Sequence, residues 1–100
     1  MYKVNQKNSI ADGTSLKGYI ETTYNNLVNL FGIPKEGSSD GKTTCEWIIE
    51  FQDGTVATIH DWKTKTTPKD IYKWSIGGHT YRALDLVQEV INIKPQPLVY

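Results

Sequence analysis

The sequence predicts a small single α+β domain in which one helix, a three-stranded antiparallel meander and a second helix follow one another. The chain has 100 residues, which is enough for one domain. Two apolar patterns with a helical repeat flank three β-rich runs, and an Asp-Gly pair separates the first two runs. We expect an N-terminal arm over 1–14, the α+β domain over 15–91 and an extended C-terminal tail over 92–100.

The first helix is predicted over 23–31. The arm before it has room for a short strand over 2–5, and the segment 15–21 fits either a strand or a helical turn. The apolar residues of the helix recur at i, i+3, i+4 and i+7 and form one stripe: Tyr24, Leu27, Val28 and Phe31. The threonines before it can cap its first turn. Gly32 suits the left-handed position after a helix, and Pro34 prevents its continuation.

A hairpin is predicted from strands 44–51 and 55–62, which turn at the Asp-Gly pair 53–54. Asp-Gly tolerates the positive φ angles of a two-residue type I′ turn. This turn pairs Phe51 with Val56 and decides which side chains share a face. The predicted core face holds Cys45, Trp47, Ile49, Phe51, Val56 and Trp62. The predicted outer face mixes charged and apolar groups: Glu46, Ile48, Glu50, Ala57, Ile59 and Asp61.

A third strand over 71–76 and a final helix over 80–91 complete the domain. In the strand, the apolar residues alternate with polar ones: Tyr72, Trp74 and Ile76. The helix has one apolar stripe: Ala83, Leu84, Val87, Val90 and Ile91. Pro95 and Pro97 keep the tail extended. We expect both helices to cover one face of the meander.

Composition argues against several classes of protein. The 11 basic and 11 acidic side chains give zero net charge, which argues against affinity gained by neutralising many phosphates of long DNA or RNA. No apolar run approaches the roughly 18 residues of a membrane span, and the start of the chain lacks the apolar region of a signal peptide. Cys45 is the single cysteine, so no internal disulfide can form. We therefore expect a soluble protein of a reducing cytosol.

Patterns for catalysis or metal binding are weak. The two histidines and the single cysteine are too scattered for a metal site, so we expect no metal and no cofactor. Cys45 lies in a predicted core strand, where a thiol is inert. The carboxylates of Glu46, Glu50 and Asp61 could flank a substrate, but a solvated or inter-subunit polar face explains them more simply.

Aromatic and basic residues give the better clue to function. Trp62 and Lys63 end the second predicted strand, Trp74 lies on the third, and the segment 77–80 opens the final helix. A helix N-terminus presents amides to a phosphate, and an indole is a stacking platform for a base. Spacing alone favours the ordinary explanation, in which the tryptophans belong to the core and the glycines form a turn.

Several strings, taken in order, resemble a widespread family of small proteins encoded by tailed bacteriophages. The first strings are D-G-T-S-L-x-G-Y-I over 12–20 and Y-x-x-L-V-x-x-F-G-x-P over 24–34. The later ones are C-E-W-x-I-x-F-x-D-G-T-V-A-T-I over 45–59, D-W-K over 61–63 and W-x-I-G-G-H over 74–79. The ordered set is similar to the anti-CBASS sponge family.

The resemblance implies an oligomer that binds a cyclic dinucleotide, such as 3′,3′-cyclic GMP-AMP, without cleaving it. The host's CBASS effector then never receives its signal, which implies an immune-evasion role in the host bacterial cytoplasm. The residues agree with this, because a doubly anionic ligand needs few cations and sequestration needs no catalytic group. We expect a homo-oligomer, either a dimer or a tetramer, with sites at subunit boundaries.

The candidate binding residues supply stacking rings, phosphate donors and hydroxyls that read base edges or ribose. The rings and phosphate donors are those of Trp62, Trp74, Lys63, Gly78 and His79. The hydroxyls are those of Thr14, Ser15 and Tyr19. Both tryptophans lie at one end of the sheet if the loop after the second strand returns antiparallel.

Two other functions stay open. One is a phage inhibitor that binds a host protein through the outer sheet face, with no small ligand. The other is a metal-dependent enzyme that degrades nucleotides with Glu46, Glu50 and Asp61. Heating the protein after incubation with a cyclic dinucleotide distinguishes the three functions. Release of intact nucleotide indicates a sponge, and loss of the nucleotide indicates an enzyme. A protein that retains no nucleotide indicates an inhibitor that binds a host protein.

Overall fold

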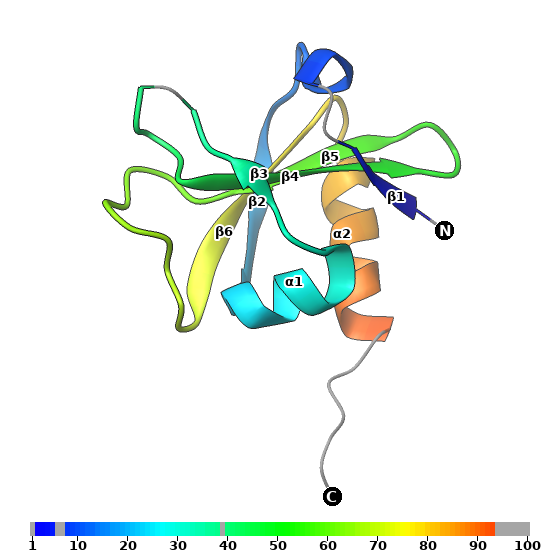
Figure 1. Cartoon of the computed structure of the whole chain (residues 1–100). Coiled ribbons are helices and arrows are strands. Elements are labelled where there is room, and N and C mark those ends of the chain that lie inside the picture. The colour runs from blue at the N-terminus through cyan, green and yellow to red at the C-terminus, as the bar shows by residue number, and fades with distance from the viewer. Residues whose placement is uncertain (1, 6–7, 39, 94–100) are drawn as a thin grey trace, which may run out of the picture.

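The computed structural model describes residues 2–5, 8–38 and 40–93, which form one antiparallel sheet with two helices (Figure 1). The strands are β1 (Tyr2–Asn5), β2 (Ser15–Thr22), β3 (Lys35–Glu36), β4 (Cys45–Phe51), β5 (Val56–His60) and β6 (Tyr72–Gly78). The helices are α1 (Tyr24–Phe31) and α2 (Arg82–Ile93), with a short 3₁₀ helix, η1 (Asn8–Ala11), between the first two strands.

The α+β class is confirmed, but the sheet is wider than the predicted meander. The order across it is β1-β4-β5-β6-β2, and β3 pairs with β4 as a sixth strand. The three predicted strands therefore form the centre as β4, β5 and β6. The arm supplies β1, which pairs with β4 and closes one of the edges that a three-stranded sheet would leave open. The segment that fitted a strand or a helical turn is the strand β2, which pairs with β6.

The β4–β5 turn is one residue longer than predicted. The N–H of Phe51 donates to the Thr55 carbonyl at 2.8 Å, and the N–H of Gly54 donates to the Phe51 carbonyl at 2.9 Å. Gly54 has a φ of 91°, the left-handed conformation that a three-residue loop with a bulge requires. Phe51 therefore faces Thr55, and the predicted pairing of Phe51 with Val56 is wrong.

The longer loop exchanges the two faces of β5. Trp47 pairs with Ile59, and Ile49 pairs with Ala57, so these two β5 residues point into the core with β4. The predictions that placed Val56 and Trp62 on the core face, and Ala57, Ile59 and Asp61 on the outer face, are therefore wrong. For β4 itself, the predicted core residues Cys45, Trp47, Ile49 and Phe51 are confirmed.

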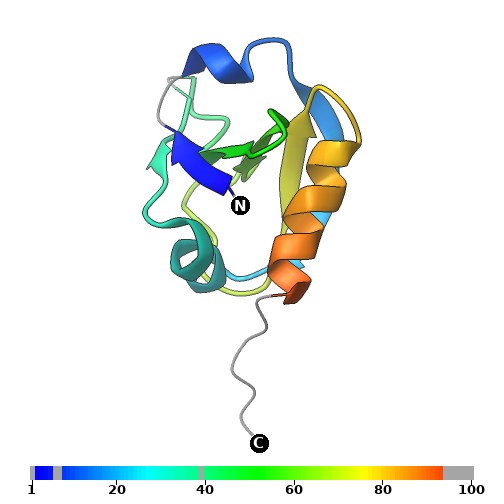
Figure 2. The ribbon, with the colours of Figure 1, turned by 90° about the vertical axis from the view of Figure 1, so that its right-hand side faces the viewer.

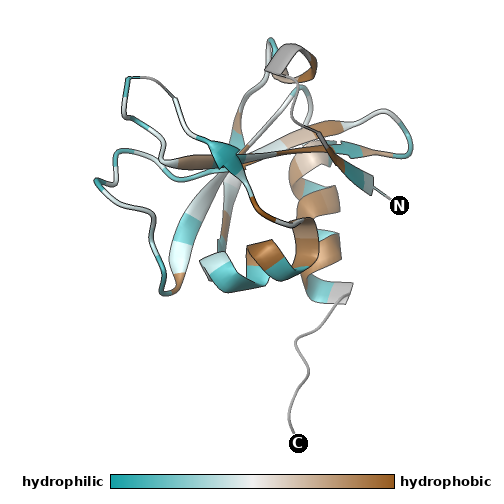
Figure 3. Ribbon diagram, in the orientation of Figure 1, coloured by the Kyte–Doolittle hydropathy of each residue, from teal (hydrophilic) through white to brown (hydrophobic). Residues whose placement is uncertain are grey.

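Both helices lie on one side of the sheet, and η1 lies on the other (Figures 1 and 2). Thr23 caps α1, because its side chain accepts a hydrogen bond from the N–H of Asn26 at 3.1 Å. Gly32 follows the helix with a φ of 85°. Figure 3 shows apolar residues concentrated on the two helices and on the central strands. The final helix runs from Arg82 to Ile93, so it starts and ends two residues later than predicted, and the first two residues of the predicted tail are helical. The rest of the tail prediction, over 94–100, lies outside the described residues.

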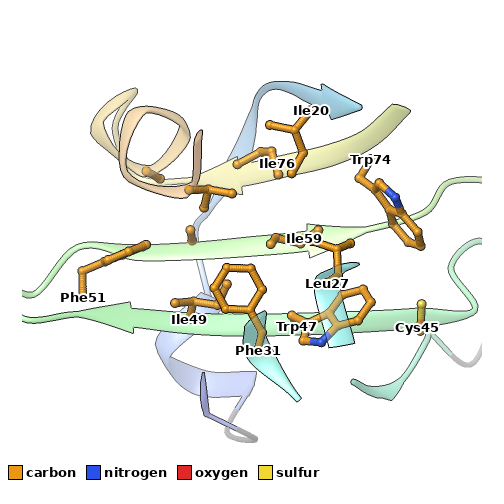
Figure 4. Close-up of a cluster of buried hydrophobic side chains, with 13 residues drawn as sticks. Ile20, Leu27, Phe31, Cys45, Trp47, Ile49, Phe51, Ile59, Trp74 and Ile76 are labelled. Carbon is orange, nitrogen blue, oxygen red and sulfur yellow. The ribbon is translucent and has the colours of Figure 1, made fainter. Parts of the chain in front are cut away.

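The core sits between the helices and the sheet, around two tryptophans (Figure 4). The rings of Trp47 and Trp74 meet edge to face, with their centres 5.6 Å apart. Each indole N–H has a partner, because Trp47 donates to the Gly32 carbonyl at 2.8 Å and Trp74 to the Thr22 carbonyl at 3.0 Å. The core therefore ties the ends of α1 to the sheet.

Candidate functional site

A cavity of about 470 Å³, here called the first cavity, opens on the sheet face opposite the two helices. Thr58 on β5 and Ser75 on β6 line it. Along their strands these residues alternate with Ile59, Trp74 and Ile76, which belong to the core. The corrected register of β5 therefore places this strand's polar residues on the cavity side.

Gly77 keeps the floor of the first cavity low. It pairs with Thr58 across β5 and β6, and a Cβ atom at Gly77 would lie 2.5 Å from the Thr58 Oγ1. Any larger residue would therefore collide with a buried hydroxyl group. The hydroxyls of Thr58 and Ser75 can each donate and accept a hydrogen bond.

Two half-exposed aromatic rings line the first cavity, and each carries an ammonium group at its face. Tyr19 is 50% exposed and Trp62 is 48% exposed. The Nζ of Lys73 lies 5.5 Å from the centre of the Tyr19 ring. The Nζ atoms of Lys42 and Lys63 lie 5.8 and 5.7 Å from the centre of the Trp62 ring. Each ring is a platform on which a planar group can stack beside a positive charge.

The backbone around Trp62 is fixed by contacts with two other segments. The N–H of Trp62 donates to the Tyr72 hydroxyl at 3.2 Å. Lys63 has a φ of 56°, which is uncommon for a residue other than glycine, and its N–H donates to the Lys42 carbonyl at 2.6 Å. This last bond joins the two lysines that flank the Trp62 ring.

Asp61, next to Trp62, is a buried carboxylate that holds the start of the loop. Its Oδ1 accepts from the N–H of Thr44 at 2.7 Å, and its Oδ2 accepts from the Thr44 hydroxyl at 2.6 Å and from the Thr64 hydroxyl. Burial opposes the charged form, but these hydrogen bonds outweigh it and hold the pKa of Asp61 below its ordinary value. Asp61 is therefore a structural anchor rather than a group that faces a ligand.

A second cavity of about 660 Å³ adjoins the first. Glu46, His60 and Trp62 line both. Lys35 of β3 and Lys42 line the second cavity together with Glu36 and Asp40, so its far side carries charges of both signs. The two cavities form one hollow that crosses the sheet from β2 to β3.

Four of the predicted binding residues lie together: Thr14, Ser15, Tyr19 and Trp62 line the first cavity. Lys63 does not line the cavity, but its Nζ lies 5.7 Å from the centre of the Trp62 ring. Residues from three distant parts of the chain are brought together because β2 pairs with β6.

Three other predicted binding residues are not in the cavity. Trp74 is fully buried in the core on the other sheet face and cannot stack on a ligand. Gly78 belongs to β6, where a Cβ atom would lie 2.4 Å from that of Ala83, so this glycine serves helix packing. His79 is exposed but lies beside Gly13. Since α2 starts only at Arg82, the amides of 78 and 79 do not form a helix N-terminus, and this prediction is wrong.

Sequence reasoning missed several residues of the hollow: Lys42, Thr58, His60, Lys73 and Ser75. A two-residue turn pairs Ile49 with Thr58 and Trp47 with His60, which puts Thr58 and His60 on the core face. A three-residue loop at Gln52–Gly54 would have placed both on the face of Glu46.

The three carboxylates considered for catalysis do not converge. Asp61 is buried with Thr44, whereas Glu50 lies beside Lys3 at 3.7 Å. Within residues 2–5, 8–38 and 40–93, no three His, Cys, Asp or Glu side chains are grouped so that they could hold a metal ion. In the same part of the chain, neither helix is long and apolar enough to cross a membrane. Comparison with family models, curated proteins and solved structures found no match for this chain.

Proposed function

We propose that the protein binds a cyclic dinucleotide, such as 3′,3′-cyclic GMP-AMP, in this hollow and sequesters it without cleaving it. In an infected bacterium this would withhold the signal from the CBASS effector. One observation carries the proposal: two exposed rings, Tyr19 and Trp62, line one cavity with lysine Nζ atoms 5.5–5.8 Å from their centres. Stacking platforms beside positive charges are what a ligand of bases and phosphates needs.

The dimensions and the polar groups of the first cavity suit such a ligand. Its volume of about 470 Å³ falls in the range of small-molecule sites, roughly 300–1,000 Å³. The hydroxyls of Thr14, Ser15 and Ser75 can bond to ribose or to base edges. The second cavity offers room for a ligand that extends past Trp62.

Replacing the stacking ring tests the proposal. We expect Trp62→Ala to weaken binding of cyclic GMP-AMP about tenfold or more, since a stacked base contributes about 1–3 kcal/mol. Trp62 is half exposed, so the variant should remain folded. Isothermal titration calorimetry measures the affinity, and thermal unfolding checks the fold.

Tyr81→Ala is the matched control, because Tyr81 is 69% exposed and has the Lys17 Nζ at 5.5 Å but does not line either cavity. Its affinity should equal that of the parent. Chromatography of the nucleotide released by heating should recover it intact. Equal affinities of Trp62→Ala and the parent would contradict the site, whereas a parent protein that retains no nucleotide would favour the inhibitor that binds a host protein.

A further inference from the structure

Glu46 is one of three carboxylates that line the hollow, and the other two, Glu36 and Asp40, line the second cavity only. Glu46 is the second residue of β4, opposite Lys35 on β3 and His60 on β5, and it lines both cavities. Its side chain is half-buried, and within the described part of the chain it accepts no hydrogen bond and forms no ion pair. A phosphate placed beside it would be repelled, so the carboxylate must face a different part of the ligand.

His60 supplies a second acceptor beside Glu46. Its Nδ1 lies 3.1 Å from the Asp61 carbonyl oxygen. A carbonyl oxygen can only accept, so Nδ1 carries the hydrogen of this contact, and Nε2 is the acceptor in that tautomer. Glu46 and His60 therefore present acceptors to the hollow, next to the Trp62 ring that lines both cavities.

Guanine matches this set of acceptors better than adenine does. Its Watson–Crick edge carries two adjacent donors, N1–H and the 2-amino group, which can bond to both oxygens of one carboxylate. Adenine has an acceptor at N1, and its lone pair would face the negative charge.

We propose that Glu46 is a specificity-determining residue that selects guanine in the bound nucleotide, assisted by His60. This inference rests on the proposed function and adds the base that the hollow prefers. Trp62 stacks on the selected base, while the two lysines near its ring, Lys42 and Lys63, meet the phosphates. Cyclic di-GMP and cyclic GMP-AMP should therefore bind more tightly than cyclic di-AMP.

The test titrates the protein by calorimetry with cyclic di-GMP, cyclic di-AMP and cyclic di-IMP, whose hypoxanthine lacks the 2-amino group. The parent should bind cyclic di-GMP at least tenfold more tightly than cyclic di-AMP, with cyclic di-IMP between them. Glu46→Gln should lose most of this preference, because its affinity for cyclic di-GMP should fall. Its affinity for cyclic di-AMP should stay within about twofold of the parent's. The cyclic di-IMP comparison needs no variant, so it holds even if the substitution disturbs folding.

Glu50→Gln is the matched control. Glu50 lies on the same face of β4 as Glu46, but it lines neither cavity. It should keep the preference of the parent. Equal binding of the three ligands, or an unchanged preference in Glu46→Gln, would overturn the inference and leave the proposed function standing. Failure of every cyclic dinucleotide to bind the parent would overturn both.

Discussion

Gly77 sets the depth of the cavity floor at the scale of a single residue. We expect Gly77→Ala to destabilise the protein by about 1–3 kcal/mol, because the new methyl group would meet the Thr58 Oγ1 at 2.5 Å, inside the packed sheet. The same methyl group should weaken nucleotide binding by raising the floor. Chemical denaturation measures the free energy of unfolding.

The cause of this destabilisation can be isolated with a second substitution. Thr58→Ala removes the hydroxyl that the methyl group would meet, so Gly77→Ala should cost clearly less in that background. An equal cost in both backgrounds would show that backbone conformation, and not the contact with Thr58, requires the glycine.

Cys45 is a residue whose character could be predicted from its position alone. The sequence placed it on the core face of a strand, and it is buried there. Burial, followed by the nearby negative charge of Asp61, raises the pKa of its thiol to about 11. Trp62 could not be judged in the same way, because its face depended on the length of a turn.

At the scale of an element, the prediction of the β4–β5 hairpin is confirmed, but its predicted register is wrong. Asp-Gly fits a two-residue turn, but it also fits a three-residue loop with glycine in the left-handed position. Side-chain contacts favour the second: Asp53 accepts from the N–H of Thr55 at 2.9 Å and from the Arg82 Nε at 2.6 Å. The partner Arg82 lies on α2, so this contact of Asp53 could not be predicted from the local sequence.

The loop after β5 should be sensitive to acid through Asp61. The pKa of this carboxyl is lowered in the folded protein, so its charged form stabilises the fold above the unfolded value, about 4. This stability is lost as the pH falls through the lowered folded pKa. We therefore expect the free energy of unfolding to decrease below about pH 4, measured by urea denaturation at a series of pH values.

Asp61→Asn should remove this part of the pH dependence and cost about 2 kcal/mol or more at neutral pH, because an amide cannot accept all the hydrogen bonds that the carboxylate accepts. Glu36→Gln serves as control, since its side chain is exposed. If Asp61→Asn retained the full acid sensitivity of the parent, other carboxyl groups would have to be responsible.

At the scale of the whole molecule, the hollow depends on the order of the strands. Tyr19 and Trp62 are distant in the sequence, but both line the first cavity because β2 pairs with β6. The sequence could nominate hydroxyls, rings and lysines by their chemistry. It could not decide which of them share a face, because that required the wider sheet and the shifted register of β5.

The edge of the sheet bears on the predicted assembly. The apolar groups of the predicted outer face cannot form a subunit contact, since Ile48, Ala57 and Ile59 are 0% exposed. Instead, β2 ends the strand order, and Leu16 on it, which also lines the first cavity, is 52% exposed. An edge strand with exposed apolar residues can pair with a second copy. We therefore expect light scattering at micromolar concentration to give two or four times the subunit mass of 11.3 kDa.

Leu16→Glu tests whether β2 forms the contact. Two copies related by a twofold axis would bring the introduced carboxylates close together, and like charges across paired strands are destabilising. The variant should therefore shift toward the monomer. Ile71→Glu is the control, because Ile71 is 73% exposed but lies in the loop before β6. The mass of this variant in solution should equal that of the parent. A parent mass of 11.3 kDa would contradict the assembly, and an unchanged oligomer in Leu16→Glu would place the contact elsewhere.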